Sequence, residues 1–143
     1  MMFTLKSEIG MDIAHYLVGY DGKCQNIHGH RYRLVVKVSA KELQKEGQLR
    51  GMVDDFGNIK EALKKISDQF DHKLLLEDNA EGRKMAQFFK DNQFGFDVAL
   101  VPYRTTVEEM SRDIYRKIKS YGIAVTEVEL YETPTNSCIY TEV

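Results

Sequence analysis

The sequence predicts an α+β domain built on an antiparallel sheet. Two stretches near the N-terminus alternate apolar and polar residues, and two later stretches carry apolar residues every three or four positions. Alternation with period two is typical of a half-buried strand, and a period near 3.6 is typical of an amphipathic helix. Strand-like runs also close the chain, so the strands come in pairs and not in alternating strand–helix units. That order favours an antiparallel sheet.

The first strand is predicted over residues 3–15 and the second over residues 28–38. In the first, the apolar side chains share one parity with a single interruption, and His15 continues that parity at the strand's end. Residues 16–27 contain two glycines and an asparagine and are typical of a loop. This loop is longer than a common hairpin turn of about two to five residues, and long ordered loops are often functional. We therefore expect an antiparallel hairpin with a functional loop.

A first helix is predicted over residues 56–70, where apolar side chains recur at helical spacing and one of the two preceding aspartates can cap the start. The sequence that follows gives weaker signals. Residues 71–76 are "DHKLLL", residues 79–92 have the pattern of a short helix, and residues 96–101, "FDVALV", have that of a short strand.

A second helix is predicted over residues 105–122, ending at Gly122. Two threonine–glutamate pairs at its start have capping-box spacing. These pairs are Thr105 with Glu108 and Thr106 with Glu109. One more strand should place Ala124, Val128, Leu130 and Glu132 on one face, and a last strand, "SCIYTEV", closes the chain.

The composition is that of an ordinary globular protein, with 143 residues, 43% hydrophobic and 29% charged. This length predicts a single domain over residues 1–143. No apolar run approaches the ~18 residues of a membrane span, and the N-terminus has no signal-peptide pattern, so a cytoplasmic location is expected. The net charge of −2 and the lack of a Lys/Arg block argue against a nucleic-acid partner. The two cysteines, Cys24 and Cys138, are expected to be free thiols.

Three histidines are predicted to converge at the mouth of the hairpin. His28 and His30 point to one face because alternate residues of a strand do so. If the two strands pair across the loop, His15 lies beside them on the same face. In a purely structural interpretation each imidazole needs its own hydrogen-bond partner. A Zn²⁺ ion satisfies all three and leaves a fourth position open, as in catalytic zinc sites, although nickel, cobalt or iron could use the same ligands.

Cys24 stands in the loop four residues before His28. It could be a fourth ligand, which would close the site and make it structural. It could instead be a thiolate that acts as base or nucleophile beside the metal, or a spectator. Spacing does not choose among these roles.

Two further positions suggest acid–base chemistry or binding. Asp71 and His72 come where the first helix should end, and form either an acid–base pair or a histidine favoured by the helix dipole. Glu132 continues an apolar parity, so its carboxylate either points inward to a partner, for example the N–H donors of a flat heterocycle, or turns out to solvent at the strand end.

Taken in order, these residues resemble the 6-pyruvoyl-tetrahydropterin synthase / 6-carboxytetrahydropterin synthase family. The motifs that carry the resemblance are "AH", "C-x-x-x-H-G-H", "V-D-D-F", "D-H", "T-x-E" and "Y-E-T-P-T-x-x-C-I-Y", from Phe3 to Tyr140. The resemblance implies the tunnelling fold, a four-stranded antiparallel sheet with two helices on one face. It also implies homo-oligomers in which sheets join edge to edge into barrels, usually hexamers built from two trimers, with active sites at subunit interfaces.

The resemblance also implies a role for each site residue. His15, His28 and His30 match the zinc ligands, Cys24 the catalytic cysteine, and Asp71 and His72 its acid–base partners. Glu132 matches the carboxylate that anchors the pterin ring, and Thr106 a residue of the pterin pocket. The implied substrate is 7,8-dihydroneopterin triphosphate, and Lys23 is the nearest cation by motif for its phosphates.

Two reactions of the family compete. One eliminates triphosphate to leave a 6-pyruvoyl product. The other also releases acetaldehyde and leaves 6-carboxy-5,6,7,8-tetrahydropterin for queuosine and 7-deazapurine synthesis. Three residues separate Cys24 from His28 here, a spacing that resembles the bacterial 6-carboxy branch. A non-catalytic, zinc-stabilised domain with Cys24 as fourth ligand is the rival from another class.

The chain departs from the family pattern in three places. Met11 replaces a frequent aromatic residue. Thr105 replaces a frequent proline, and residues 77–104 are longer than in compact members.

Overall fold

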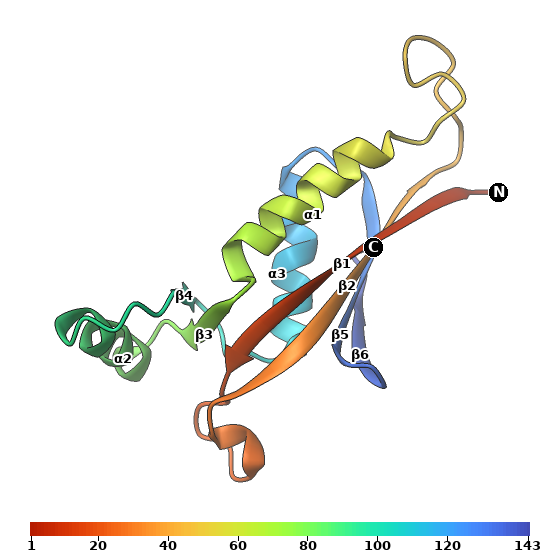
Figure 1. Cartoon of the computed structure of the whole chain (residues 1–143). Coiled ribbons are helices and arrows are strands. Elements are labelled where there is room, and N and C mark those ends of the chain that lie inside the picture. The colour runs from red at the N-terminus through yellow and green to blue at the C-terminus, as the bar shows by residue number, and fades with distance from the viewer.

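The computed structural model describes all 143 residues and contains one curled, six-stranded sheet with two helices against one face (Figure 1). The strands are β1 (Phe3–His15), β2 (His28–Ala40), β3 (Lys73–Glu77), β4 (Val98–Val101), β5 (Val125–Thr133) and β6 (Asn136–Tyr140). The helices are the short 3-10 helix η1 (Lys23–Gln25), α1 (Phe56–Phe70), α2 (Ala80–Asp91) and α3 (Val107–Ser120). The strand order across the sheet is β4-β3-β1-β2-β5-β6.

The predicted hairpin is confirmed and is the longest ladder of the sheet. β1 and β2 pair antiparallel without a break from Phe3 opposite Ala40 to His15 opposite His28. Because the side-chain period of a strand is two, an unbroken register keeps most apolar side chains of both strands on one face, with Val35 on the other. That face carries Met11, Tyr32 and Leu34, all fully buried.

α1 and α3 cover this apolar face side by side (Figure 1). Asp55 caps α1 by accepting a hydrogen bond from the Gly57 N–H, and Thr106 caps α3 by accepting from the Glu109 N–H. Gly122 ends the α3 segment with a left-handed φ of 87°, as its position predicts. The core is a single cluster of buried side chains between these two helices and the sheet.

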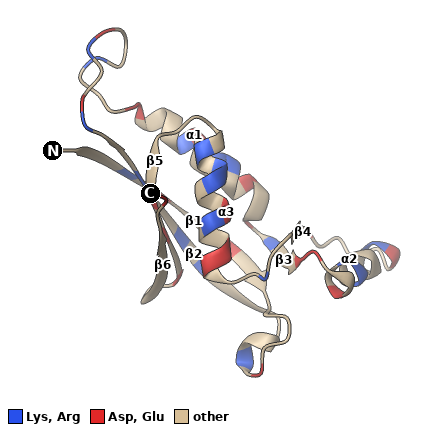
Figure 2. Ribbon diagram, turned by 180° about the vertical axis from the view of Figure 1, so that it is seen from behind, with Lys and Arg blue, Asp and Glu red and all other residues tan.

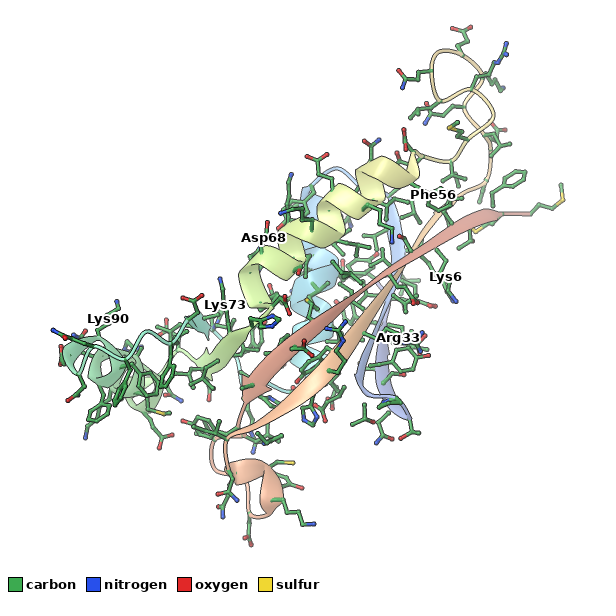
Figure 3. The ribbon with its side chains drawn as sticks, viewed as in Figure 1. Lys6, Arg33, Phe56, Asp68, Lys73 and Lys90 are labelled. Atoms are coloured by element: carbon green, nitrogen blue, oxygen red, sulfur yellow. The ribbon has the colours of Figure 1, made fainter.

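The expectation of a four-stranded antiparallel sheet with two helices is wrong for residues 71–101. These residues form a β3-α2-β4 excursion whose two strands extend the sheet in parallel. β3 pairs with β1 only at Ile13 and Ala14, and the apolar residues Leu75 and Leu76 bury their side chains there. Figure 1 shows the excursion reaching away from α1 and α3, and Figure 3 marks its start at Lys73 and its outer part at Lys90.

The predicted inward face of the fifth strand is also partly wrong. Ala124 is exposed, whereas Val125 and Val128 are buried, so the parity changes between them. The cause is an irregularity in the β2–β5 ladder between Lys37 and Val38, which inserts a residue and flips the alternation. Beyond the irregularity, Val128 and Leu130 face the core as expected.

Basic and acidic residues are interspersed along the helices, as Figure 2 shows from behind. The longest, α1, has 15 residues, and none of the helices combines the length and apolar character of a membrane span.

Both sides of the hairpin sheet end in strand edges that lack a partner. β3 covers only the last part of β1, and Asp71 and His72 occupy the backbone groups of Asp12. The edge of β1 from Phe3 to Met11 is therefore open, and β6 has a single neighbour. Ile139 on β6 is 58% exposed. Open edges of this length are sites where another chain can add a strand.

Candidate metal centre and active site

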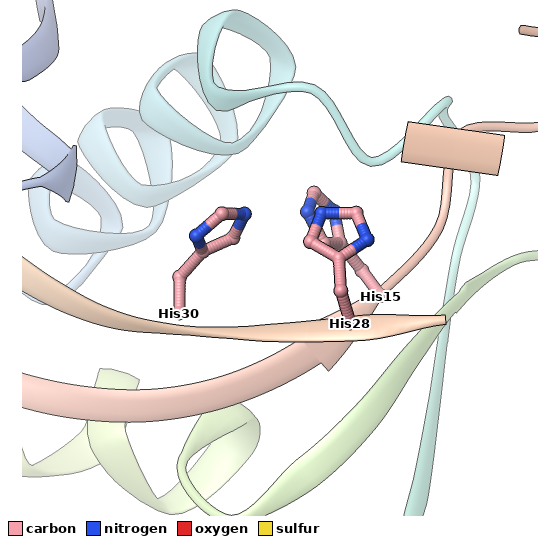
Figure 4. Close-up of side chains that lie close together, drawn as sticks. All are labelled: His15, His28 and His30. Carbon is pink, nitrogen blue, oxygen red and sulfur yellow. The ribbon is translucent and has the colours of Figure 1, made fainter. Parts of the chain in front are cut away.

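The β1–β2 register brings the three predicted histidines together. His15 lies directly opposite His28, and His30 lies opposite Ile13, two residues along the same face. Their ring centroids are 4.7 to 5.3 Å apart, and one ring nitrogen from each lies within 4.8 Å of the other two. Figure 4 shows the three rings standing on the same side of the hairpin, toward α3.

Hydrogen bonds fix the protonation of two of these rings. His15 Nδ1 lies 2.8 Å from the Thr105 carbonyl oxygen, and His28 Nδ1 lies 2.7 Å from the Asn26 carbonyl oxygen. A carbonyl only accepts, so each Nδ1 must donate and each Nε2 keeps its lone pair. Outer partners of this kind orient metal-binding histidines.

The Nε2 atoms of all three histidines are buried and have no hydrogen-bond partner in the protein. Buried polar atoms are rarely left without a partner, so three converging unpaired nitrogens indicate a ligand. Their number and type fit a metal ion that takes three imidazoles and leaves another position open.

Burial lowers the pKa of His15 and of His30, which favours the neutral ring that a metal ligand needs. It lowers the pKa of His15 from 6.5 to about 4, and the charges of His28 and His30 add to the effect. Burial also lowers the pKa of His30, although the Glu132 carboxylate works in the opposite direction.

Glu132 and Tyr32 border the histidine triad. Glu132 Oε1 lies 3.7 Å from His30 Nε2, and its side chain is 30% exposed, so the carboxylate points to the triad and not away to solvent. Tyr32 is fully buried against His15 and His30, and its hydroxyl lacks a partner. Burial, and next the charge of Glu132, raise the pKa of Tyr32.

Cys24 lies in η1, within the loop between β1 and β2. The loop folds back because the Leu17 N–H donates to the Cys24 carbonyl at 2.8 Å. The Cys24 side chain is half-buried and its sulfur is not part of the close group of ligand atoms that the histidines form.

Lys23 in the same turn is exposed. Thr106 stands at the start of α3, where its hydroxyl serves as the helix cap.

Asp71 and His72 form a pair beside β1. His72 Nδ1 lies 2.9 Å from Asp71 Oδ2, the Asp12 N–H donates to Asp71 Oδ1, and the His72 N–H donates to the Asp12 carbonyl. Burial alone would raise the pKa of Asp71, but the bonds from Asp12 and His72 hold it below its usual value. The hydrogen bond and charge of Asp71 raise the pKa of His72.

This pair lies on the other side of the hairpin from the triad. Asp12 alternates with the inward residues of β1 and forms an ion pair with Arg31, its outward partner on β2. A cavity of about 610 Å³ borders His72, and its lining also includes Asp12, Gly29, His30 and Phe96. One chain therefore holds two groups of reactive side chains that face different ways.

The family described as 6-pyruvoyl tetrahydropterin synthase matches residues 4–143 of the chain. The chain belongs to this family. Among curated relatives, the 6-carboxy-5,6,7,8-tetrahydropterin synthase of Haemophilus influenzae is 39% identical over 147 residues, with 99% of this chain and 100% of that protein covered. The protein of the same name from Rickettsia felis is 33% identical over 139 residues, with coverages of 93% and 96%. The solved structure of Caenorhabditis elegans 6-pyruvoyl tetrahydropterin synthase matches with a TM-score of 0.71 at 24% identity and covers 100% of this chain and 97% of that one.

In this member of the 6-pyruvoyl tetrahydropterin synthase family, sequence reasoning missed the residues that support the triad. Thr105 is 1% exposed, and its hydroxyl donates to the Tyr16 carbonyl while its own carbonyl accepts from His15. Asn26 contributes only backbone, so its identity gives no signal. For Thr105 a signal existed, because two threonines stood at capping positions and only one could be the cap.

Proposed function

We propose that the chain is a 6-carboxy-5,6,7,8-tetrahydropterin synthase, a lyase. It converts 7,8-dihydroneopterin triphosphate to the 6-carboxy product and releases acetaldehyde and triphosphate, on the route to queuosine and other 7-deazapurines. The observation that carries the proposal is the convergence of three unpaired Nε2 atoms in a chain whose full-length curated relatives bear this name. The three-residue gap between Cys24 and His28 agrees with this branch of the family.

We assign the triad to Zn²⁺, held by His15, His28 and His30. The donor set supports this choice because zinc favours neutral imidazole and tolerates three protein ligands with an open position. Zinc, when bound, supplies a Lewis acid that favours loss of a proton from the substrate's side-chain hydroxyls. Glu132, beside His30 and partly exposed, is placed to accept N–H donors of the pterin ring. Thr106 and Lys23 are assigned to the pterin pocket and to the phosphates.

Proton transfer is assigned to Cys24 on one side of the substrate and to His72 on the other, with Asp71 holding the His72 ring. The two groups face different sides of the hairpin within one chain, so we propose that His72 serves the triad of a neighbouring subunit. The open edges of β1 and β6 support association by strand addition. The proposed assembly is a barrel of three chains, stacked in pairs as a hexamer.

Product analysis tests the reaction. Purified protein is incubated with 7,8-dihydroneopterin triphosphate, and acetaldehyde and the pterin are identified by mass spectrometry. Acetaldehyde and 6-carboxytetrahydropterin in equal amounts are expected, with activity lost on chelation and restored by zinc. Turnover without acetaldehyde would favour the pyruvoyl reaction. No turnover, together with a Cys24 that resists alkylation only when zinc is present, would favour the zinc-stabilised domain.

Mixing two inactive variants tests the shared site. Cys24→Ala and His72→Ala are co-refolded or co-expressed, with Cys138→Ala as the matched cysteine control. If sites combine one chain's Cys24 with another's His72, random mixing restores about a quarter of the sites. A mixture as inactive as its components would show that each chain completes its own site.

A further inference from the structure

Arg104 is a cation without an anion at the entrance to α3. Its Nε atom is buried and has no hydrogen-bond partner, and the side chain makes no ion pair. The ring of Tyr20 lies nearby, with its centroid 5.8 Å from the guanidinium carbon. A half-buried charge is costly unless something pairs with it.

Most other arginines of the chain are paired. Five of the seven form ion pairs with carboxylates, and Arg50 is the other exception. Arg31 and Arg33, the arginines nearest the triad in sequence, pair with Asp12 and Glu8 on the opposite face of the hairpin. They are therefore neither free nor directed toward the histidines.

Two neighbours connect Arg104 to the site. The next residue, Thr105, accepts the hydrogen bond from His15 Nδ1. Tyr20 belongs to the same loop as Cys24, and the turn is closed by the bond from Leu17 to Cys24. Figure 4 shows the chain that enters α3 running past η1 near the histidines. Arg104 thus stands next in the chain to the residue that supports His15, and its guanidinium lies near a ring of the loop that carries the thiol.

We propose that Arg104 binds the triphosphate of the substrate and holds it as it leaves. This rests on the proposed function and adds a specificity residue to it. A guanidinium offers a planar fork of donors that matches phosphate oxygens in pairs, which a lysine ammonium cannot do. Lys23, exposed in η1, then has a lesser part at the outer end of the phosphate chain.

The test separates phosphate binding from loop positioning by comparing two ligands. Binding of inorganic tripolyphosphate is measured by calorimetry, and the inhibition constant of 7,8-dihydroneopterin, which lacks phosphates, is measured against the substrate. Arg104→Gln should weaken tripolyphosphate binding and raise KM for the triphosphate about tenfold or more, and leave dihydroneopterin inhibition within about twofold. Arg104→Lys should recover part of the loss. Arg33→Gln removes the same charge from the opposite face and should change neither value by more than about twofold.

Three outcomes would overturn the assignment. Arg104→Gln and Arg33→Gln could weaken the binding of tripolyphosphate equally, which would indicate a general charge effect. Arg104→Gln could weaken the binding of both ligands to the same extent, which would indicate that Arg104 only positions the Tyr20 loop. Lys23→Gln could account for the whole loss of tripolyphosphate binding, with no loss in Arg104→Gln, which would assign the phosphates to Lys23. Failure of the proposed function looks different, because wild-type protein would then release no acetaldehyde whatever Arg104 does.

Discussion

The buried His15 should make the metal-free protein less stable in mild acid. Its imidazole is 1% exposed, and burial lowers its pKa from 6.5 to about 4. Below pH 6.5 the unfolded chain takes up a proton at His15 that the folded chain does not. The free energy of unfolding must therefore fall as the pH drops from 6.5 toward 4.

The size of this effect follows from the two pKa values. A difference from 6.5 to about 4 corresponds to at most ~3.5 kcal/mol, since each pH unit is worth ~1.4 kcal/mol. Most of the change comes between pH 7 and pH 5, where the loss should be about 2 kcal/mol. His15→Gln removes the titrating group, so the variant should lack this part of the pH dependence even though it is less stable overall.

Urea unfolding in the presence of a chelator, followed by circular dichroism at one protein concentration, measures the effect. The quantity of interest is the wild-type change between pH 7 and pH 5 minus the change in His15→Gln. His72→Gln is the control, because the raised pKa of His72 gives the opposite sign: its contribution is complete below pH 6.5 and is lost as the pH rises through the raised value. Parallel curves for wild type and His15→Gln, within about 0.5 kcal/mol, would refute the reasoning.

Three other perturbations have defined outcomes. Cys24→Ser should keep the metal content measured by atomic absorption but lower kcat at least about a hundredfold, because the substitution changes the thiol and not the metal ligands. Loss of metal would instead indicate that Cys24 is a ligand. Asp71→Asn should lower the pKa of His72, so that the alkaline limb of the kcat–pH profile moves to lower pH; an unmoved limb would separate that limb from His72. Gly82→Ala places a Cβ 2.1 Å from the Glu77 carbonyl oxygen and should destabilise the protein by about 1–3 kcal/mol in thermal unfolding. Gly95→Ala is the control and should have little effect, because there is open space around Gly95. Equal stabilities of the two variants would show that α2 shifts freely.

The triad could be predicted from the sequence because it depends on one property of strands. Alternation placed His15 on the inward parity of β1 and His28 and His30 on that of β2. The unbroken antiparallel register then brought the three side chains next to one another. The same property failed for Ala124, where a ladder irregularity of one residue changed the parity. Alternation is a local pattern, whereas an irregularity is set by the partner strand, so only a structure reveals it.

A short strand at β4 was predicted, but β3 and the parallel pairing of both strands were beyond this kind of reasoning for another reason. "KLLL" is a short apolar run with no period, and such a run is equally compatible with a helix end, an antiparallel strand or a parallel one. What decides is the free edge of β1 at Ile13 and Ala14, a contact between segments about sixty residues apart. The place of Asp71 and His72 depends on the same contact, which is why adjacency in sequence could not tell which face they would occupy.

β1 connects the two halves of the proposed site through its register. Asp12 holds Asp71 and His72 with its backbone N–H and carbonyl, while His15, three residues on, faces the other way and completes the triad. A slip of β1 by one residue would turn the imidazole of His15 outward and shift the backbone groups that hold the acid–base pair. The buried Met11 and Ile13 lie between these positions and forbid that slip, because their side chains would leave the core. Core packing along one strand therefore sets the geometry of both faces, and in the proposed assembly it is association with a second chain that brings the two faces together.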